Sequence, residues 1–218
     1  MKGTRIVLLT LVCFPLLHCL STPAAAASRT GDPTHFQESY DFEAIGRMEE
    51  ALASLDKLSE AKRGGYVAML RRGWLLYRLG RNVQAIEVYE KAAALDPKAI
   101  EARLGLLLPL MAERRWPGAE KTAREVLKAD PANYTATLRL AFVQYNQGRY
   151  SESGTLYQKL ADAYPSDVEV RAGLGWALLK LGRGSEAAST FREVLDISPK
   201  NALARQGLTA ASAISRSH

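Results

Sequence analysis

A repeat of 34 residues is the feature of this sequence that most constrains its fold. Four prolines recur at that spacing: Pro97, Pro131, Pro165 and Pro199. Each proline closes a similar phrase, of which Leu-Asp-Pro-Lys around Pro97 and Ile-Ser-Pro-Lys around Pro199 are examples. A fixed period of this length predicts stacked supersecondary units that contact mainly their neighbours, rather than one globular core.

Within one period the apolar residues predict two helices joined by a tight turn. Residues 67–79 have a helical apolar pattern that ends at Gly80, and a second amphipathic pattern runs to Leu95. Asp96 and Pro97 end that second helix, because proline cannot continue a helix. The repeated unit is therefore a first helix, a turn and a second helix.

Small and large residues also keep the period, which indicates close packing between antiparallel helices. The small ones are Gly73, Ala141 and Gly175 in first helices, and Ala51, Ala85, Ala119, Ser153 and Ala187 in second helices. The large ones are Leu55, Tyr89, Tyr157 and Phe191, and Ala123 is the exception in that column.

These phrases resemble the tetratricopeptide repeat family over residues 66–201, as four full repeats without insertion. The residues that carry the resemblance are Gly73, Tyr77, Gly80, Ala85, Tyr89 and Pro97, then Gly148, Arg149, Tyr150, Tyr157 and Pro165, then Gly175, Gly182, Arg183, Glu186, Ala187, Phe191 and Pro199. The resemblance implies an all-α fold, a right-handed superhelical solenoid of helix-turn-helix repeats.

The repeat phase divides the chain into segments. We expect a signal peptide (1–27), a flexible segment (28–33), a degenerate repeat that caps the N-terminal end (34–65), four repeats (66–99, 100–133, 134–167, 168–201), and a C-terminal capping helix and tail (202–218). Caps are expected because the end units of a stack must cover an apolar face.

The repeat that starts at Ile100 departs from the pattern. Arg114 stands where the other repeats have glycine, and Leu107 stands where Gly73 and Gly175 do. Pro109 lies inside the first helix, four residues after Gly105, so we expect a kink there.

The N-terminal 27 residues have the layout of a secretory signal. Lys2 and Arg5 precede an uncharged apolar run, residues 6–20, and four alanines follow. We therefore expect an exported protein, periplasmic or secreted. An uncleaved anchor and a lipid on Cys19 are the alternatives. Cys13 and Cys19 are the two cysteines of the chain, so the mature protein has no disulfide.

No set of residues indicates catalysis. Outside the signal the histidines are His35 and His218, near the two ends of the chain, which disfavours a histidine acid–base site. We expect no enzyme activity, no metal site and no cofactor. The net charge of +6 falls to +4 without Lys2 and Arg5, and the arginines are scattered, so we expect no nucleic-acid partner.

The candidate site is a wall of apolar residues on the first helices. The resemblance implies that this face lines the concave side, where ligands bind. The expected peptide groove consists of Tyr40, Leu70, Trp74, Tyr77, Leu108, Met111, Arg139, Phe142, Tyr145 and Trp176. Arg71, Arg78 and Lys180 flank it, and Trp116 is expected in the turn between helices. Of the positions that one branch of the family uses to clamp a carboxylate, Arg139 alone fits, so that clamp is absent.

The sequence thus favours a non-catalytic scaffold or adaptor that binds a peptide segment of an exported or envelope protein. Three alternatives stay open for the wall. Its aromatic residues pack only between neighbouring helices, or the groove holds this chain's own N-terminal segment, or it holds a second copy. For the protein as a whole, the alternatives are a structural homo-oligomer and an accessory factor of a machine that assembles pili, cytochromes or exported polysaccharide.

Overall fold

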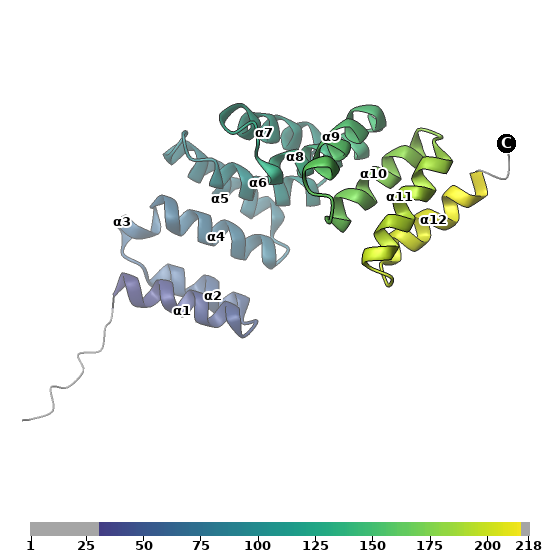
Figure 1. Cartoon of the computed structure of the whole chain (residues 1–218). Helices are drawn as coiled ribbons and strands as arrows, with labels where there is room; N and C mark the ends of the chain where they lie inside the picture. The colour runs from purple at the N-terminus through teal and green to yellow at the C-terminus, as the bar shows by residue number, and fades with distance from the viewer. Residues whose placement is uncertain (1–30, 215–218) are drawn as a thin grey trace, which may run out of the picture. The chain divides into compact units, whose positions relative to one another are not determined.

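The computed structural model describes residues 31–214, and every regular element in that range is a helix. Figure 1 labels the helices in chain order. The N-terminal elements are α1 (Asp32–Ala44), α2 (Met48–Ser54), the 3-10 helix η1 (Leu55–Lys57) and α3 (Glu60–Arg63). The four full repeats comprise α4 (Tyr66–Arg78) with α5 (Asn82–Leu95), α6 (Glu101–Ala112) with α7 (Trp116–Ala129), α8 (Tyr134–Asn146) with α9 (Tyr150–Ala163), and α10 (Val168–Lys180) with α11 (Gly184–Ile197). Helix α12 (Ala202–Ile214) follows them.

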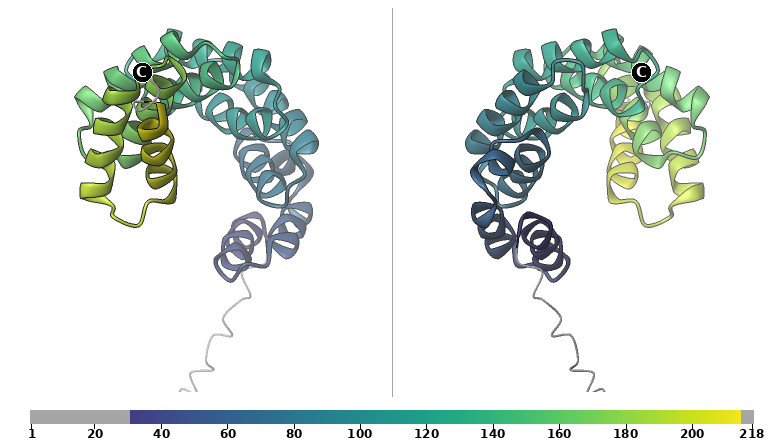
Figure 2. Two further views of the ribbon diagram at one scale, coloured as in Figure 1. Left: turned by 90° about the vertical axis from the view of Figure 1, so that its right-hand side faces the viewer. Right: turned by 90° about the vertical axis from the view of Figure 1, so that its left-hand side faces the viewer.

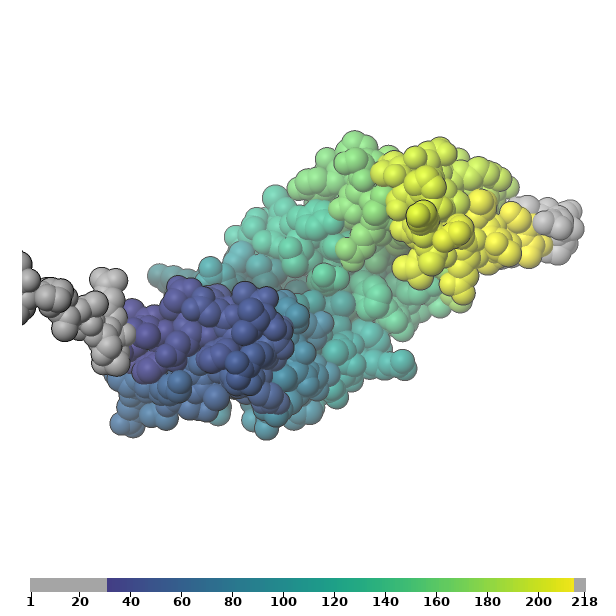
Figure 3. All heavy atoms as spheres, turned by 90° about the horizontal axis from the view of Figure 1, so that it is seen from below, coloured from purple at the N-terminus to yellow at the C-terminus, as the bar shows by residue number. Residues whose placement is uncertain are grey.

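The helices of residues 31–214 stack in chain order, and each packs on the helix before it and the helix after it from α4 onward. Successive first helices, α4, α6, α8, α10 and α12, also contact one another. Hollows open instead between the second helices α5 and α7, and between α9 and α11. The stack is therefore tighter on the first-helix side, which is the inner side of the curve in Figure 2. Seen from below, the central helices lie recessed between the two ends (Figure 3).

One aromatic ring from each of three second helices fits against glycine in a first helix. The Tyr89 ring lies where a Cβ on Gly73 would come within 2.9 Å of it, and a Cβ on Gly105 would come even closer. Both rings of the later repeats are placed in the same way, Tyr157 against Gly173 and Phe191 against Gly175 and Gly207. The expected pairing of small and large residues is confirmed, and it extends to the first helix of the following repeat.

The repeat at residues 100–133 fills the space of the aromatic ring differently, because its second helix, α7, carries Ala123 at that position. Leu107 of α6 is fully buried in the same apolar cluster as Ala123, so the volume comes from the first helix. Arg139 then stands 16 residues after Ala123, at the position that Gly105 and Gly173 occupy after their own rings. Leu55 and Arg71 repeat this spacing in the N-terminal unit. Sixteen residues after an aromatic ring the chain has glycine, and sixteen residues after Leu55 or Ala123 it has arginine.

The kink expected at Pro109 was inferred in part from Gly105, and the structure gives a different reason for that glycine. Helix α6 runs through Pro109 as one element and ends at Ala112, and the proline ring is fully buried. Gly105 is needed because the Tyr89 ring occupies the space of its Cβ. The Gly105–Pro109 pair is therefore not in itself a sign of a kink.

The turns between first and second helices need a left-handed residue. Glycine supplies it at Gly46, Gly80, Gly148 and Gly182, with φ between 73° and 78°. In the central repeat Arg114 takes this role with φ 52°, and it is the one non-glycine residue with positive φ among residues 31–214. Cβ crowding makes that conformation costly for an arginine.

The N-terminal end of the described stack begins earlier than expected. Helix α1 begins at Asp32, so residues 32 and 33 are helical rather than flexible; Pro33 suits a first turn. The Asp32 carboxylate accepts hydrogen bonds of 2.6 Å from both the backbone N–H and the hydroxyl of Ser59. The segments 1–27 and 28–30 lie outside the described residues, so the signal peptide stays a prediction.

Helix α12 covers the last repeat and presents a polar outer face. Ala204, Gly207 and Ala211 are buried, and Gly207 faces the Phe191 ring. The positions that hold Gly175 and Leu178 in α10 hold Thr209 and Ser212 in α12. This exchange of apolar for polar residues is what a terminal cap requires.

We expect Gly105→Ala to destabilise the protein by about 2–3 kcal/mol, because the new Cβ overlaps the Tyr89 ring and overpacks the core. Gly118→Ala is the matched control in the neighbouring helix. A Cβ there lies 3.5 Å from Leu110, so we expect a gain of about 0.5–1 kcal/mol from helix propensity. Chemical denaturation of the full chain measures both. Equal effects of the two substitutions would contradict the ring–glycine fit.

We expect Arg114→Gly to stabilise the protein by about 1 kcal/mol, because glycine adopts a positive φ without Cβ strain. The converse change, Gly148→Arg, should cost about the same in a turn of the same geometry. Melting of the two variants beside the natural chain tests the pair. A destabilised Arg114→Gly variant would show that the arginine side chain supports the turn.

Candidate functional site

The ten residues of the expected groove all lie on first helices. Helix α1 carries Tyr40; α4 carries Leu70, Trp74 and Tyr77; α6 carries Leu108 and Met111; α8 carries Arg139, Phe142 and Tyr145; α10 carries Trp176. These helices form the tighter, concave side of the stack. Tyr40 is 51% exposed and Phe142 is 40% exposed, and the other eight are half-buried. We name these ten residues the first-helix wall.

At the N-terminal end of the wall, the Glu43 carboxylate of α1 joins three groups of α4. Trp74 donates its indole N–H to Glu43 over 2.6 Å, and Arg78 lies 3.6 Å from the same carboxylate. Arg71 forms the third contact, an ion pair. Burial alone would raise the pKa of Glu43, but the hydrogen bonds from Trp74 and Arg71 outweigh it and hold the pKa below its usual value.

Arg71 corrects one expectation, because it is not free to flank a ligand. Its side chain is buried and donates to the hydroxyl of Ser39 over 3.1 Å and to the Ser39 carbonyl over 2.8 Å. Its guanidinium also lies 3.9 Å from the centre of the Tyr40 ring. Arg71 thus holds α1 against α4, and the half-exposed Tyr40 ring is fixed in place by a cation–π contact.

In the middle of the wall, Phe142 packs edge-on against Trp116, with ring centres 6.3 Å apart. Trp116 was expected in a turn, but it is the first residue of α7 and is half-buried against the apolar cluster that contains Leu107 and Ala123. The helix begins there because Pro117 is favoured at its first turn. Trp116 therefore supports Phe142 from the neighbouring repeat.

Towards the C-terminal end, the wall is partly core. Trp176 packs edge-on against Phe191, with ring centres 5.6 Å apart, and Tyr145 packs against Tyr150 at 5.3 Å. Arg139 is half-buried; its guanidinium reaches Glu169 over 3.5 Å, and its Nε has no hydrogen-bond partner. The wall residues therefore support the fold and still present part of their rings to solvent. Their role in binding stays a prediction.

Two hollows on the second-helix side were not foreseen from the sequence. One of about 990 Å³ lies between α9 and α11 over Leu174, Leu178 and Leu181. A smaller one of about 440 Å³ lies between α5 and α7 over Leu106 and Leu110. The floor leucines of the two hollows are 68 residues apart, a spacing of two repeats that could have revealed them. No residue of the first-helix wall lines either hollow.

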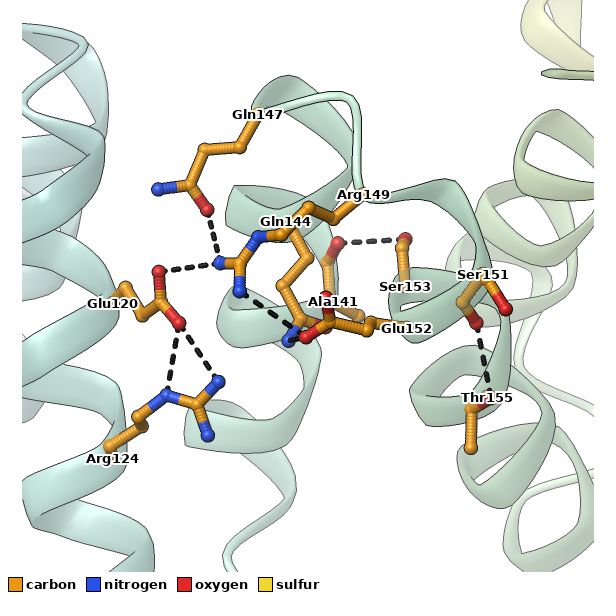
Figure 4. A network of polar contacts seen from close by, with 10 residues as sticks. All are labelled: Glu120, Arg124, Ala141, Gln144, Gln147, Arg149, Ser151, Glu152, Ser153 and Thr155. Carbon is orange, nitrogen blue, oxygen red and sulfur yellow. Dashed lines mark hydrogen bonds and ion pairs between the residues drawn. The ribbon is translucent and has the colours of Figure 1, made fainter.

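Between these hollows, polar side chains link α7 to α9 (Figure 4). Arg149 donates to Glu120 over 2.5 Å and to Glu152 over 3.2 Å, and it also contacts Gln147. Gln144 donates to Glu152 over 3.0 Å, at the position where the other two repeats have floor leucines. With an amide in place of a leucine, the interface between α7 and α9 holds a charged network where the other two interfaces have a hollow.

The described part of the chain has no helix that is both long and apolar enough to cross a bilayer.

Comparisons with known proteins agree with this architecture. A family model described as "Tetratricopeptide repeat" matches residues 36–100, 108–168 and 144–202. No curated protein matches the chain significantly. Among solved structures, "MamA 41-end from Desulfovibrio magneticus RS-1" has a TM-score of 0.71 at 20% identity and covers 78% of this chain and 96% of its own. The "Crystal structure of MamA protein" has a TM-score of 0.67 at 19% identity, with 78% and 93% covered.

A third structure comes from Thermus thermophilus and is described as TTC0263, "a thermophilic TPR protein". It has a TM-score of 0.63 at 18% identity, and the alignment covers 83% of this chain and 98% of that one. At these identities the likeness to solved structures concerns the fold alone. The family model, however, spans well over half of the sequence, and the chain belongs to the tetratricopeptide repeat family.

Proposed function

We propose that this protein is a non-catalytic interaction scaffold that binds an apolar segment of another protein along the first-helix wall. The observation that carries the proposal is the partial exposure of aromatic rings on the concave side, with Tyr40 51% and Phe142 40% exposed. Exposed aromatic residues on a concave surface are typical anchors for a protein ligand.

The packing of the rings favours binding over simple surface exposure. Phe142 lies against Trp116, and Trp176 lies against Phe191, so each ring is held in one orientation before a ligand arrives. A ligand then loses little free energy in ordering them, which is the usual benefit of a preformed surface. The curvature of the stack places α4, α6, α8 and α10 side by side, so that one extended or helical segment could contact several of them.

A structural homo-oligomer is the second candidate, and the C-terminal end of the stack disfavours an end-to-end form of it. The outer face of α12 carries Thr209 and Ser212 where a continuing repeat would need apolar residues. A polar outer face at the C-terminal end favours a stack that does not grow there. Dependence of the particle size on protein concentration would revive this candidate.

The place of action is part of the proposal. The signal-like layout of residues 1–27 supports export, so we propose a partner in the periplasm, the envelope or the secreted fraction. A role as an accessory factor in assembling pili, cytochromes or exported polysaccharide is the more specific form of this proposal. N-terminal sequencing of the exported protein tests it, with a start near Ser28 as the expected result and an intact Met1 as the contrary one.

The binding test uses peptides selected on the full chain from a random displayed library, with affinities measured by fluorescence anisotropy. We expect Phe142→Ala to weaken the selected peptides by about 2 kcal/mol, as loss of a central aromatic anchor does. Tyr164→Ala is the matched control. Tyr164 is 45% exposed and also makes one edge-on ring contact, to Tyr134, but it follows a second helix.

We expect the Tyr164→Ala variant to keep the affinity of the natural chain within about twofold, which corresponds to about 0.4 kcal/mol. Melting curves of both variants show whether each is folded, since each loses one ring contact. Peptides that bind both variants equally well, while both stay folded, would place the binding surface away from the first-helix wall and overturn the proposal.

A further inference from the structure

Five arginines stand at the same place in successive repeats, directly before each second helix. They are Arg47, Arg81, Arg115, Arg149 and Arg183. Four of the five are neutralised by glutamate within the chain. The pairs are Arg47 with Glu50 at 2.8 Å, Arg81 with Glu49 at 2.6 Å, Arg149 with Glu120 and Glu152, and Arg183 with Glu186 at 2.5 Å. The network around Arg149 is visible in Figure 4.

Arg115 is the exception, and the sequence shows why. The partner three residues later is glutamate at Glu50, Glu152 and Glu186, but Gly118 stands there in the central repeat. The other internal sources of a carboxylate are the positions of Glu49 and Glu120, which for Arg115 hold Val83 and Ile86. All three positions that supply a carboxylate to the equivalent arginines therefore hold an uncharged residue around Arg115. Within residues 31–214 its side chain has neither a hydrogen bond nor an ion pair.

The neighbouring residue adds a second free positive charge at the same turn. Arg114 is exposed, has no ion pair within the described residues, and holds φ at 52° where the other turns have glycine. The acidic residue beside it, Glu113, accepts a hydrogen bond from the uncharged amide of Asn82 over 2.9 Å and forms no ion pair with either arginine in the described residues. An arginine kept in a strained conformation at a turn that glycine fits better points to a role for its side chain.

The surroundings of the turn suit an anion. Helix α7 starts at Trp116, so its positive N-terminal end lies next to the two arginines. Trp116 in turn contacts Phe142 of the first-helix wall. The turn therefore adjoins the most exposed ring in the middle of that wall. The groups that neutralise the equivalent arginines are all glutamate carboxylates, so the chemistry that fits this site is an acidic protein side chain.

We propose that the Arg114–Arg115 turn binds acidic side chains of a partner protein segment. This inference rests on the proposed function, that the chain binds a protein segment, and it names the chemistry of the residues that flank the apolar anchor. An exposed arginine pair that forms no ion pair within residues 31–214 can make charge-assisted hydrogen bonds with an incoming carboxylate and steer its approach. The partner segment then has glutamate or aspartate next to an apolar residue that contacts Phe142.

The test uses two fluorescein-labelled peptides that differ in charge alone. One carries glutamates around a single phenylalanine, and its twin carries glutamines in their place. Binding to the full chain is followed by anisotropy at low ionic strength, where surface charges act most strongly. We expect the natural chain to bind the glutamate peptide about tenfold more tightly than the glutamine twin.

Two variants should remove that preference by different routes. Arg115→Gln deletes the charge, and Gly118→Glu supplies the internal carboxylate that the other repeats have. A side chain at position 118 has room, because the nearest atom, from Leu110, lies 3.5 Å from its Cβ. We expect each to reduce the tenfold preference to about twofold or less while binding of the glutamine twin is unchanged.

Arg183→Gln is the matched control, because Arg183 occupies the equivalent turn but is already paired with Glu186. It should keep the tenfold preference. An equal loss in Arg183→Gln and Arg115→Gln would mean diffuse attraction to a basic protein and would overturn the inference. So would an unchanged preference in Arg115→Gln and Gly118→Glu.

The two proposals fail in different ways. If both peptides bind through Phe142 but with equal affinity, the first-helix wall stands and the acidic site is refuted. If the glutamate peptide binds in an Arg115-dependent manner and Phe142→Ala has no effect, the acidic site stands and the wall is refuted. If neither peptide binds, the acidic site is refuted too, because several glutamates of one peptide should bind measurably to two unpaired arginines at low ionic strength.

Discussion

The fit of an aromatic ring between glycines of two first helices is the contact on which the rest of the stack depends. Tyr89 joins α4 to α6 in this way, and Phe191 joins α10 to α12. A ring placed there covers both neighbours at once, so one side chain couples two repeats. Because the glycines let the first helices approach closely, the stack is tight on that side and opens between the second helices, which produces the concave wall.

The two units without an aromatic ring at this position contain buried polar contacts or a strained turn. The N-terminal unit has Leu55 in place of a ring, and it is held by Arg71, Ser39 and Glu43. The central repeat has Ala123, and the same repeat carries the left-handed Arg114 and the unpaired Arg115. The regular interfaces thus provide stability, and the irregular ones hold the charged groups that an adaptor needs for specificity.

The sequence was enough to predict the helices and their pairing, because the 34-residue period shows in proline, glycine and ring positions together. It also placed the ten wall residues on the first helices. It could not foresee that Glu43 and Ser39 engage Arg71, or that Trp116 begins α7 and supports Phe142, since these contacts join residues from different repeats. The second-helix hollows were missed because their two-repeat spacing is interrupted by Gln144. Residues 1–27 lie outside the described residues, so export stays a prediction.

Hydrogen exchange of the full chain, with and without a selected peptide, tests the central claim most directly. If the first-helix wall is the binding surface, the slowed amides lie in α6, α8 and α10 and in the turn at residues 113–115, and those of α9 and α11 exchange as before. Protection confined to α9 and α11, around the hollow over Leu174 and Leu178, would place binding on the opposite side of the stack and contradict the account.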